Sequence, residues 1–312
     1  MNIIEKISDK IYISRSELVN FVHTAPRRYK KYFIYKRDGV NKRQIAQPSK
    51  EVKFIQRLAI SELKDLLPVH ECATAYVTGR SIKENAERHR LNKFLLKMDL
   101  VNFFPSITPS MLFSVMMKSN LDVSNENKLF LGSLFFWKLR RNSKLRLSIG
   151  APSSPFVSNV VMYHFDQDVN EYCKQRGITY TRYADDMTFT TNNKGALAEI
   201  PYLIKATLKK NFGTRMKVNS KKTVFSSKAF NRHVTGITIN NNDKLSLGRE
   251  KKRLISAMVH HFILGKLDED SIYKLKGLLA YAMHIEPTFM TMIERKYSKN
   301  EINNIFSIAV NK

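Results

Sequence analysis

The spacing of apolar residues divides the chain into helical and strand-like segments. Residues 1–24 carry Ile, Leu, Phe and Val at helical spacing, so one or two helices are expected there. In residues 32–47, apolar and polar positions alternate around Asp38-Gly39, which predicts a β-hairpin. Another helix is predicted from Pro48 onward. Its expected apolar face is formed by Val52, Ile55, Leu58 and Ala59.

The middle of the chain mixes short strands with longer helices. The run FLLKMDL (94–100) predicts a buried strand that ends in a carboxylate and is stopped by the following FFPSI. Residues 108–137 are rich in Met and Phe and have a helical pattern. GAPSSP (150–155) interrupts the chain before a helix predicted at 158–173. A hairpin is expected around YADD (183–186).

The last third of the chain becomes increasingly helical. A helix at 195–212, a strand at 217–225 and a hairpin at 233–248 are predicted, followed by helices from Arg249 onward. No internal repeat is visible. The apolar face expected for the final helices consists of Leu254, Met258, Phe262, Leu275, Leu278 and Leu279.

Composition narrows the class of protein. The chain has 312 residues, 43% of them hydrophobic, which is enough for a large core in two or three subdomains. No apolar run approaches the ~20 residues that a membrane span requires, and the N-terminus lacks the apolar segment of a signal peptide. Cys72 and Cys173 are too few for a disulfide framework or a thiolate zinc site. A cytoplasmic protein without a membrane partner is therefore expected.

The charge points to a polyanionic partner. Lys and Arg total 53 against 27 acidic residues, a net charge of +26, far more than solubility alone requires. Such an excess is typical of proteins that bind nucleic acid or an anionic membrane surface. The basic segments are interleaved with Tyr and Phe, and no lipid-anchoring motif accompanies them, so nucleic acid is favoured. These segments are 25–43, 89–93, 138–146 and 249–253.

Two adjacent carboxylates, Asp185 and Asp186, interrupt an apolar stretch. An Asp-Asp pair is ordinary at a turn, but the apolar flanks predict buried strands whose tip faces a cleft. Asp99 ends another predicted strand far enough upstream for a crossover to bring the two strands together. Carboxylates at neighbouring strand ends suit hard divalent cations. Two Mg²⁺ ions with a nucleoside triphosphate would explain the cluster.

Four motifs in order give a family resemblance. MDLVNFFPSI, GAPSSP, RYADD and VNSKKT resemble the palm motifs of reverse transcriptases. NAERH (85–89) and HVTGI (233–237) resemble signatures of bacterial retron reverse transcriptases, and the chain is identified as a member of that family. The motifs cover about residues 25–250.

The resemblance implies an α+β, right-hand polymerase fold with an antiparallel palm sheet and helices. The fingers would occupy 1–98, including the N-terminal helices, and would interleave with the palm. The palm would span 99–248 with an inserted fingers segment, and a helical thumb at 249–312 would recognise RNA.

The resemblance also implies roles for particular residues. Asp99, Asp185 and Asp186 would be catalytic, and together with Leu100 they would hold two Mg²⁺ ions. The implied nucleotide-binding residues are Lys42, Arg43, Phe104, Gly150, Ala151 and Lys222. The implied RNA-binding residues are Asn85, His89, Thr235, Gly236, Lys251, Lys252, Arg253 and Lys274.

Some of these roles have plain alternatives. Phe104 would lie under the incoming sugar and reject a 2′-hydroxyl, or it could be a core residue. Lys222 would donate a proton to the departing pyrophosphate, although the neighbouring Lys221 leaves the register open.

The remaining roles carry alternatives of the same kind. Lys42 and Arg43 could simply be solvated. Asn85 and His89 could be packed helical residues, and Thr235-Gly236 could belong to an ordinary hairpin rather than a primer grip.

Two positions depart from the family pattern. Ile149 replaces the Gln that usually precedes GAPSSP, which affects the expected contact with the base pair. Asn102 replaces an acidic residue often found three positions after the first catalytic Asp. Neither position belongs to the carboxylate triad, so the departures bear on nucleotide selectivity rather than on catalysis.

The implied function is RNA-directed DNA synthesis from deoxynucleoside triphosphates. One cognate non-coding RNA would act as primer and template, starting from a guanosine 2′-hydroxyl and giving branched multicopy single-stranded DNA. The segment after the palm is shorter than an RNase H domain of the usual ~100 residues, so a host ribonuclease H is an expected partner. An accessory effector protein and a role in anti-phage defence are also expected.

Two alternatives remain at this point. One is another bacterial reverse transcriptase, from a group II intron or a diversity-generating element. The other is a non-catalytic RNA-binding scaffold that keeps the palm only as architecture. The intact triad disfavours the scaffold, because buried carboxylates without a cation would only destabilise the fold.

Overall fold

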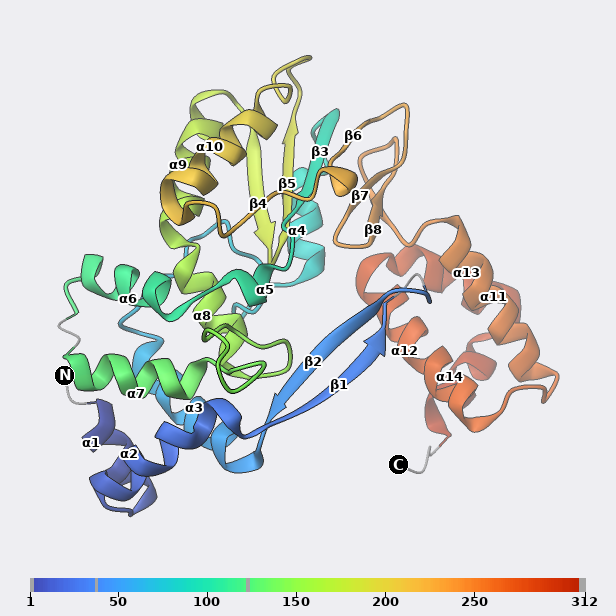
Figure 1. The fold of residues 1–312 in the computed structure, drawn as a ribbon. Helices are drawn as coiled ribbons and strands as arrows, with labels where there is room; N and C mark the ends of the chain where they lie inside the picture. Colours follow the sequence, from blue (N-terminus) through green and yellow to red (C-terminus); the bar gives the residue numbers. More distant parts are fainter. Residues whose placement is uncertain (1–2, 37–38, 122–123, 309–312) are drawn as a thin grey trace. The chain divides into compact units, whose positions relative to one another are not determined.

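The computed structural model describes residues 3–36, 39–121 and 124–308, and contacts divide it into two compact units (Figure 1). Unit 1 comprises Met1–Arg80 and Leu96–Val224, and unit 2 comprises Ser81–Leu95 and Phe225–Lys312. Both units combine helices with antiparallel strands, as expected for an α+β protein. The three segments predicted as fingers, palm and thumb stay a prediction.

The N-terminal part of unit 1 folds as its pattern predicts. The expected helices are α1 (Ile3–Ile11) and α2 (Arg15–Thr24), followed by the short 3-10 helix η1 (Ala25–Arg27). Helix α2 begins with a capping box, in which the Ser14 side chain accepts a hydrogen bond from the backbone of Glu17. The predicted hairpin is formed by β1 (Tyr29–Tyr35) and β2 (Lys42–Pro48), antiparallel and in register from Tyr29–Pro48 to Tyr35–Lys42. Asp38 of its predicted turn lies outside the described residues.

Helix α3 (Lys50–Leu63) buries a polar residue in its core-facing stripe. Val52, Ile55 and Ala59 are buried as predicted, whereas Leu58 is only half-buried. Gln56 is fully buried, and its amide donates to the Tyr29 hydroxyl at 3.1 Å and to the Leu134 carbonyl at 2.7 Å. These hydrogen bonds offset the cost of burying the amide nitrogen, whereas Oε1 of Gln56 is buried without a hydrogen-bond partner.

A four-stranded sheet with the order β4-β5-β3-β6 carries the segments with Asp99 and with RYADD. Its strands are β3 (Phe94–Asp99), β4 (Thr179–Tyr183), β5 (Asp186–Thr191) and β6 (Val224–Ser227). Figure 1 shows α9 (Tyr163–Gln175) and α10 (Ile200–Phe212) beside β4 and β5. The crossover from β3 to β5 therefore brings the two predicted carboxylate-bearing strands side by side.

Several predicted boundaries in unit 1 were wrong. The helical segment 108–137 contains two helices, α6 (Pro109–Lys118) and α7 (Asn125–Phe135), and the short α5 (Phe103–Ser106) precedes them. Helix α8 (Ser153–Val161) starts inside GAPSSP, because Pro155 lies in its first turn, where a missing backbone N–H costs no helical hydrogen bond. The helix predicted from residue 195 begins at Ile200. Most of the strand predicted at 217–225 is instead a loop with the 3-10 turn η2 (Ser220–Lys222).

Unit 2 packs helices against a small three-stranded antiparallel sheet. The helices are α4 (Ile82–His89), α11 (Arg249–Ile263), α12 (Glu269–Ile285), α13 (Pro287–Tyr297) and α14 (Lys299–Ser307). The strands are β7 (Arg232–Val234), β8 (Ile237–Ile239) and β9 (Leu245–Ser246), so the predicted hairpin is confirmed and extended by one strand.

The apolar face predicted for the last helices is largely confirmed. Met258, Leu275 and Leu279 are buried, and Phe262 and Leu278 pack against them. Leu254 is 42% exposed, and Ile255 and Val259 occupy the core instead, a shift of one position along α11. Among the described residues, no helix is both long enough and apolar enough to cross a membrane.

Candidate active site

Asp99 lies at the end of β3, where the sheet delivers it to a cluster of polar groups. Its side chain is 7% exposed. One carboxylate oxygen accepts from the Asn219 amide at 3.1 Å and the other from the Lys222 ammonium at 2.8 Å. The backbone adds a bond from Asn219 N–H to the Asp99 carbonyl at 2.7 Å. The VNSKKT motif thus lies beside the first of the three carboxylates that the sequence predicts to be catalytic.

Asp185 is presented by a two-residue turn between β4 and β5. Tyr183 pairs with Asp186 across the hairpin, so Ala184 and Asp185 form the turn. Ala184 has a φ of 57°, a left-handed conformation that costs about 1 kcal/mol or more for a residue with a Cβ. The Asp185 carbonyl accepts from the backbone N–H of Leu100 at 3.2 Å, which ties the turn to the end of β3.

The three carboxylates interact electrostatically. Burial, together with the charges of Asp186 and Asp99, raises the pKa of Asp185 to about 6. Burial and Asp99 likewise raise the pKa of Asp186, although its side chain opens to solvent. The hydrogen bond to Asp99 raises the pKa of Lys222 and so keeps its ammonium protonated. The site therefore holds more negative charge than its one directly paired lysine compensates.

The side chains of this cluster do not enclose a metal ion in the structure described. Among residues 3–36, 39–121 and 124–308, no three His, Cys, Asp or Glu side chains converge closely enough to enclose an ion. The Lys222 ammonium pairs with Oδ2 of Asp99, and Lys222 and Lys97 both offset part of the negative charge at Asp186.

Three of the predicted nucleotide-binding residues line one pocket. It has a volume of about 370 Å³ and includes Phe104, Gly150 and Ala151. Phe104 is half-buried, with its ring centroid 6.5 Å from that of Tyr76, so it forms a wall of the pocket and is not a closed core residue.

Gly150 allows the pocket to form against the hairpin. Its φ is 121°, and a Cβ at this position would lie 3.0 Å from the Ile45 side chain and 3.2 Å from the Ala46 carbonyl. The Ala46 N–H donates to the Ile149 carbonyl at 2.9 Å, which fixes β2 against the loop. Ile149 lines the pocket in the place of the usual Gln, and so gives this wall an apolar surface.

The cations of the pocket differ from those predicted. Lys42 and Arg43 are exposed on β2 and do not line it, although Arg43 is close enough to Tyr76 to affect its pKa. Lys53 and Arg57 line it instead. They lie four residues apart and therefore on one face of α3. The sequence shows this pair of basic residues, but neither belongs to a recognised motif.

Tyr76 was also missed. It has a φ of 61°, is 53% exposed and lies between Phe104 and Tyr183, 6.4 Å from the Tyr183 ring. Burial, then Tyr183 and then the charge of Asp185 raise the pKa of its hydroxyl. Its ring therefore connects the pocket with the carboxylate turn.

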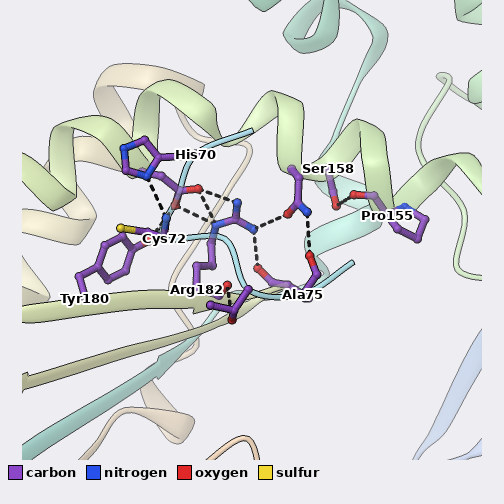
Figure 2. A network of polar contacts seen from close by, with 11 residues as sticks. His70, Cys72, Ala75, Pro155, Ser158, Tyr180 and Arg182 are labelled. Atoms are coloured by element: carbon purple, nitrogen blue, oxygen red, sulfur yellow. Dashed lines mark hydrogen bonds and ion pairs between the residues drawn. The ribbon is translucent and has the colours of Figure 1, made fainter. Parts of the chain in front are cut away.

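A buried polar network lies behind the turn (Figure 2). The side chains of Arg182 and Asp166 are both 0% exposed and form an ion pair at 2.6 Å. The backbone of Arg182 pairs with the segment that precedes Tyr76, since its N–H donates to the Cys72 carbonyl at 2.8 Å. Cys72 and Cys173 are both buried with free thiols, and burial raises the pKa of each.

The structure buries Asn85 and His89, which were predicted to bind RNA. Both side chains of α4 are 0% exposed within unit 2. Burial lowers the pKa of His89 to about 3, so its imidazole is neutral. A direct contact of either side chain with RNA does not fit this burial, and both side chains instead form part of the packing of unit 2.

The other predicted RNA-binding residues form a partly exposed group in unit 2. Thr235 and Gly236 make the tight turn between β7 and β8, both with positive φ. Lys251 donates to the Gly236 carbonyl at 3.0 Å, and Lys252 is paired with Glu286 at 2.6 Å. Arg253 and Lys274 are exposed, and Tyr273 is 63% exposed beside Lys274.

Comparisons with known proteins agree with the motifs. The family model of reverse transcriptases (RNA-dependent DNA polymerases) matches residues 34–239. The chain is 48% identical over 279 residues to the retron Ec83 reverse transcriptase of Escherichia coli, with 89% of each chain covered. It is 31% identical over 312 residues to the retron Ec86 reverse transcriptase of the same organism, covering 97% of this chain and 93% of the relative.

A solved structure confirms the fold. The telomerase of Candida albicans superimposes with a TM-score of 0.53 at 14% identity, covering 89% of this chain and 59% of the telomerase. At this identity the likeness concerns the fold alone, which is the right-hand polymerase fold expected from the motifs.

Proposed function

Because the chain belongs to the bacterial retron reverse transcriptases and is therefore an RNA-directed DNA polymerase, we propose that Asp99, Asp185 and Asp186 are its catalytic residues. The observation that carries the proposal is the electrostatic interaction among three carboxylates on the neighbouring strands β3 and β5 and the turn before β5. The pocket lined by Phe104 lies beside these carboxylates. The ring of Tyr76 connects the two, because it lies between Phe104 of the pocket and Tyr183 of the carboxylate hairpin.

The donor set suits Mg²⁺. Reverse transcriptases generally use divalent metal ions, and three carboxylates are the hard oxygen ligands that Mg²⁺ prefers. The raised pKa of Asp185 reflects its burial first and then the neighbouring negative charges, and a bound cation would offset both. Leu100 can contribute only its backbone carbonyl. When bound, two Mg²⁺ ions would favour attack by the primer hydroxyl and departure of pyrophosphate.

The pocket and its surroundings supply contacts for a deoxynucleoside triphosphate. We assign Phe104 to the face of the sugar, where its ring would exclude a 2′-hydroxyl. Gly150 and Ala151 would bound the nucleotide on the opposite side. The four cations available for the phosphates are Lys42, Arg43, Lys53 and Arg57.

Lys222 is the proposed proton donor to pyrophosphate. Its ammonium is held 2.8 Å from Asp99, and this hydrogen bond raises its pKa, so the proton to be donated is present at neutral pH. Lys221 is not engaged with Asp99 in this way, which favours Lys222 for the role.

We further propose that the RNA substrate is a cognate structured non-coding RNA that acts as primer and template. Synthesis would begin at a guanosine 2′-hydroxyl and give branched multicopy single-stranded DNA. The net charge of +26 and the retron relatives support this proposal. The exposed Arg253 and Lys274, with the turn at Thr235-Gly236 and Lys251-Lys252, would contribute to RNA binding in unit 2.

The cellular setting proposed is the bacterial cytoplasm. A host ribonuclease H would remove template RNA, and an accessory effector protein would act with the enzyme in anti-phage defence. These proposals rest on the retron relatives alone.

The decisive experiment replaces single carboxylates by amides. Asp185→Asn and Asp186→Asn should each reduce single-turnover primer extension to less than about a hundredth of the parent rate, because a metal ligand is lost. RNA binding, measured by gel shift over a range of salt concentrations, should persist because it depends on the basic surface.

The matched control is Asp168→Asn. Asp168 is a partly exposed carboxylate of α9 paired with Lys210 at 2.9 Å, and its loss should leave extension unchanged. Extension by either active-site variant at near the parent rate would remove the proposed centre.

A separate measurement tests the RNA proposal. Nucleic acid that co-purifies with the protein from its host should be one DNA species joined to RNA through a 2′–5′ linkage. Unrelated RNA–DNA mixtures without that linkage would contradict retron-type priming while leaving the polymerase assignment in place.

A further inference from the structure

Arg182 makes side-chain contacts in three directions from the interior of unit 1. Its Nε and Nη2 donate to Asp166 at 2.8 Å and 2.6 Å. Its Nη1 donates to the Ala184 carbonyl at 3.0 Å and to Oδ1 of Asn159 at 3.3 Å. The arginine fork is therefore engaged from all sides, and Figure 2 shows it enclosed between α9, α8 and β4.

One arm of these contacts reaches the carboxylate turn. Ala184 is the residue of that turn with positive φ, and its carbonyl is the atom that Arg182 holds. A hydrogen bond to this carbonyl resists relaxation of the strained peptide, because rotation would break a charge-assisted bond in the interior. Asp185, the next residue, is thereby fixed in direction.

The other arm reaches the nucleotide pocket. Asn159 accepts from Arg182 with its oxygen and donates with its amide nitrogen to the Ala75 carbonyl at 2.8 Å. Thr74, one residue earlier, donates to the Arg182 carbonyl from its backbone N–H at 2.8 Å and from its hydroxyl at 3.2 Å. The segment that ends in Tyr76 is thus held on the same arginine as the carboxylate turn.

Stability alone does not account for an ion pair in this place. Both partners are 0% exposed, and a buried pair of this kind is often no more stabilising than well-packed apolar residues. Its specific contribution is geometry, because a guanidinium can donate in several fixed directions at once and an apolar side chain cannot.

We propose that Arg182 is a positioning residue that couples the carboxylate turn to the Tyr76 side of the nucleotide pocket, with Asp166 and Asn159 as its supports. The proposal rests on the function proposed above, since it concerns the placement of Asp185 toward a metal ion. It assigns to Arg182 no contact with substrate or metal.

The main test is Arg182→Lys. Lysine keeps the positive charge opposite Asp166 but, as a point charge, cannot reproduce the bonds to Ala184 and Asn159. We expect kcat to fall about tenfold or more and the KM for deoxynucleotide to rise. Binding of Mn²⁺ to the protein, followed by electron paramagnetic resonance without nucleotide, should weaken by about the same factor.

The matched control is Tyr180→Phe. The Tyr180 hydroxyl donates to the same Asp166 at 2.8 Å, so the variant also removes one buried hydrogen bond from that carboxylate. No hydrogen bond described here connects this hydroxyl with the turn or with Tyr76. The variant should lower the melting temperature, yet change kcat, KM and Mn²⁺ affinity by less than about twofold.

A second variant separates the two arms. Asn159→Asp keeps an oxygen for Arg182 and loses the donor to the Ala75 carbonyl. It should raise the KM for deoxynucleotide more than it lowers kcat, and should leave Mn²⁺ binding near the parent value. An unchanged KM in Asn159→Asp would overturn the coupling to Tyr76. This variant therefore tests the contact through Asn159 even if Arg182→Lys does not fold.

The proposal as a whole is overturned if folded Arg182→Lys retains the parent's kcat, KM and Mn²⁺ affinity. The pair would then be only structural. Failure of the proposed catalytic centre has a different signature, because Asp185→Asn would then keep both activity and Mn²⁺ binding.

Discussion

Two hairpin turns, one in each unit, are built alike but anchored differently. The β4–β5 turn and the β7–β8 turn each contain two residues and a non-glycine residue with positive φ, Ala184 and Thr235. Each is preceded in its strand by an arginine whose side chain is completely buried, Arg182 and Arg232.

The partners of the two arginines differ. Arg182 is paired with a carboxylate that is itself fully buried, and it holds the carbonyl of the turn. Arg232 donates to the backbone carbonyls of Arg90, Asn92 and Asn240, and to Asp243, which is 24% exposed. The first arginine fixes a functional turn, whereas the second joins loops of unit 2 at some distance from its own turn.

This contrast shows that similar turns carry different costs. The first turn must hold a carboxylate whose pKa is raised by burial and by neighbouring like charges, so it needs support from several sides. The second turn holds no carboxylate, and Gly236 takes its positive φ without steric cost, so the strain of Thr235 is the main cost of this turn.

The largest expected effect concerns the free energy of unfolding, and it would sharpen the contrast between the two buried arginines. Arg232→Met should lower the free energy of unfolding by about 3 kcal/mol, because three carbonyls lose a buried donor. Catalysis per folded molecule should not change. Thermal or urea unfolding measures the first quantity and active-site titration the second.

Lys228→Met is the control for that variant. It removes the other partner of Asp243, at 2.6 Å, from a site that is about one-third exposed. The expected loss is below about 1 kcal/mol. Equal losses for the two variants would show that the buried carbonyl contacts of Arg232 carry no special weight.

The next effect concerns the pocket beside the first turn. Phe104→Val should admit a 2′-hydroxyl and raise ribonucleotide use relative to deoxyribonucleotide use by about tenfold in single-turnover assays. Phe103→Leu is a matched control, because Phe103 is a buried neighbour at 3% exposure and does not line the pocket. An unchanged ratio for Phe104→Val would make Phe104 a packing residue.

A smaller effect concerns charge at the first turn. A carboxyl pKa near 6 in the folded state, against about 4 when unfolded, means that folding favours the protonated form. Stability from this group is present below about pH 4 and is lost as the pH rises through about 6.

Asp185→Asn should therefore raise the melting temperature of the metal-free protein at pH 8 by about 2 °C or more, with a gap that narrows toward pH 4. Calorimetry in the presence of EDTA measures it. A higher melting temperature for the parent than for the variant at pH 8 would contradict the raised pKa of Asp185.

The smallest effect expected is at the second turn. Gly236 has a φ of 80°, and an added Cβ would meet no atom within 4 Å. Gly236→Ala should cost about 1 kcal/mol through backbone strain alone, and Gly236→Asn less, because Asn tolerates the left-handed region. Equal costs for both, measured by urea unfolding, would point to a contact rather than to strain.

The elements that carry the motifs were predictable because each depends on local sequence. The apolar run before Asp99, the Asp-Asp pair between apolar flanks and the final amphipathic helices each follow a period that a short window reveals. The adjoining placement of Asp99 and Asp185 followed from strand ends and was confirmed by the sheet order.

The missed features depend on distant parts of the chain. Arg182 and Asp166 lie on a strand and a preceding helix, and neither residue type signals complete burial. The burial of Asn85 and His89 depends in the same way on the packing of unit 2, which a helical pattern of mostly charged residues does not reveal. Lys217 and Val218 have the pattern of a strand. The conformation of residues 217–223 is instead set by the hydrogen bonds of Asn219 and Lys222 to Asp99, which lies far away in the sequence.

The two buried thiols have a practical consequence for spectroscopy. Alkylating reagents react with exposed thiolate, so Cys72 and Cys173 should remain unmodified in the folded protein. Dyes could then be attached to cysteines introduced at Leu129 of unit 1 and Met292 of unit 2, which are 73% and 51% exposed. Each dye would report on the surroundings of its own unit during nucleotide addition, with the native cysteines left in place.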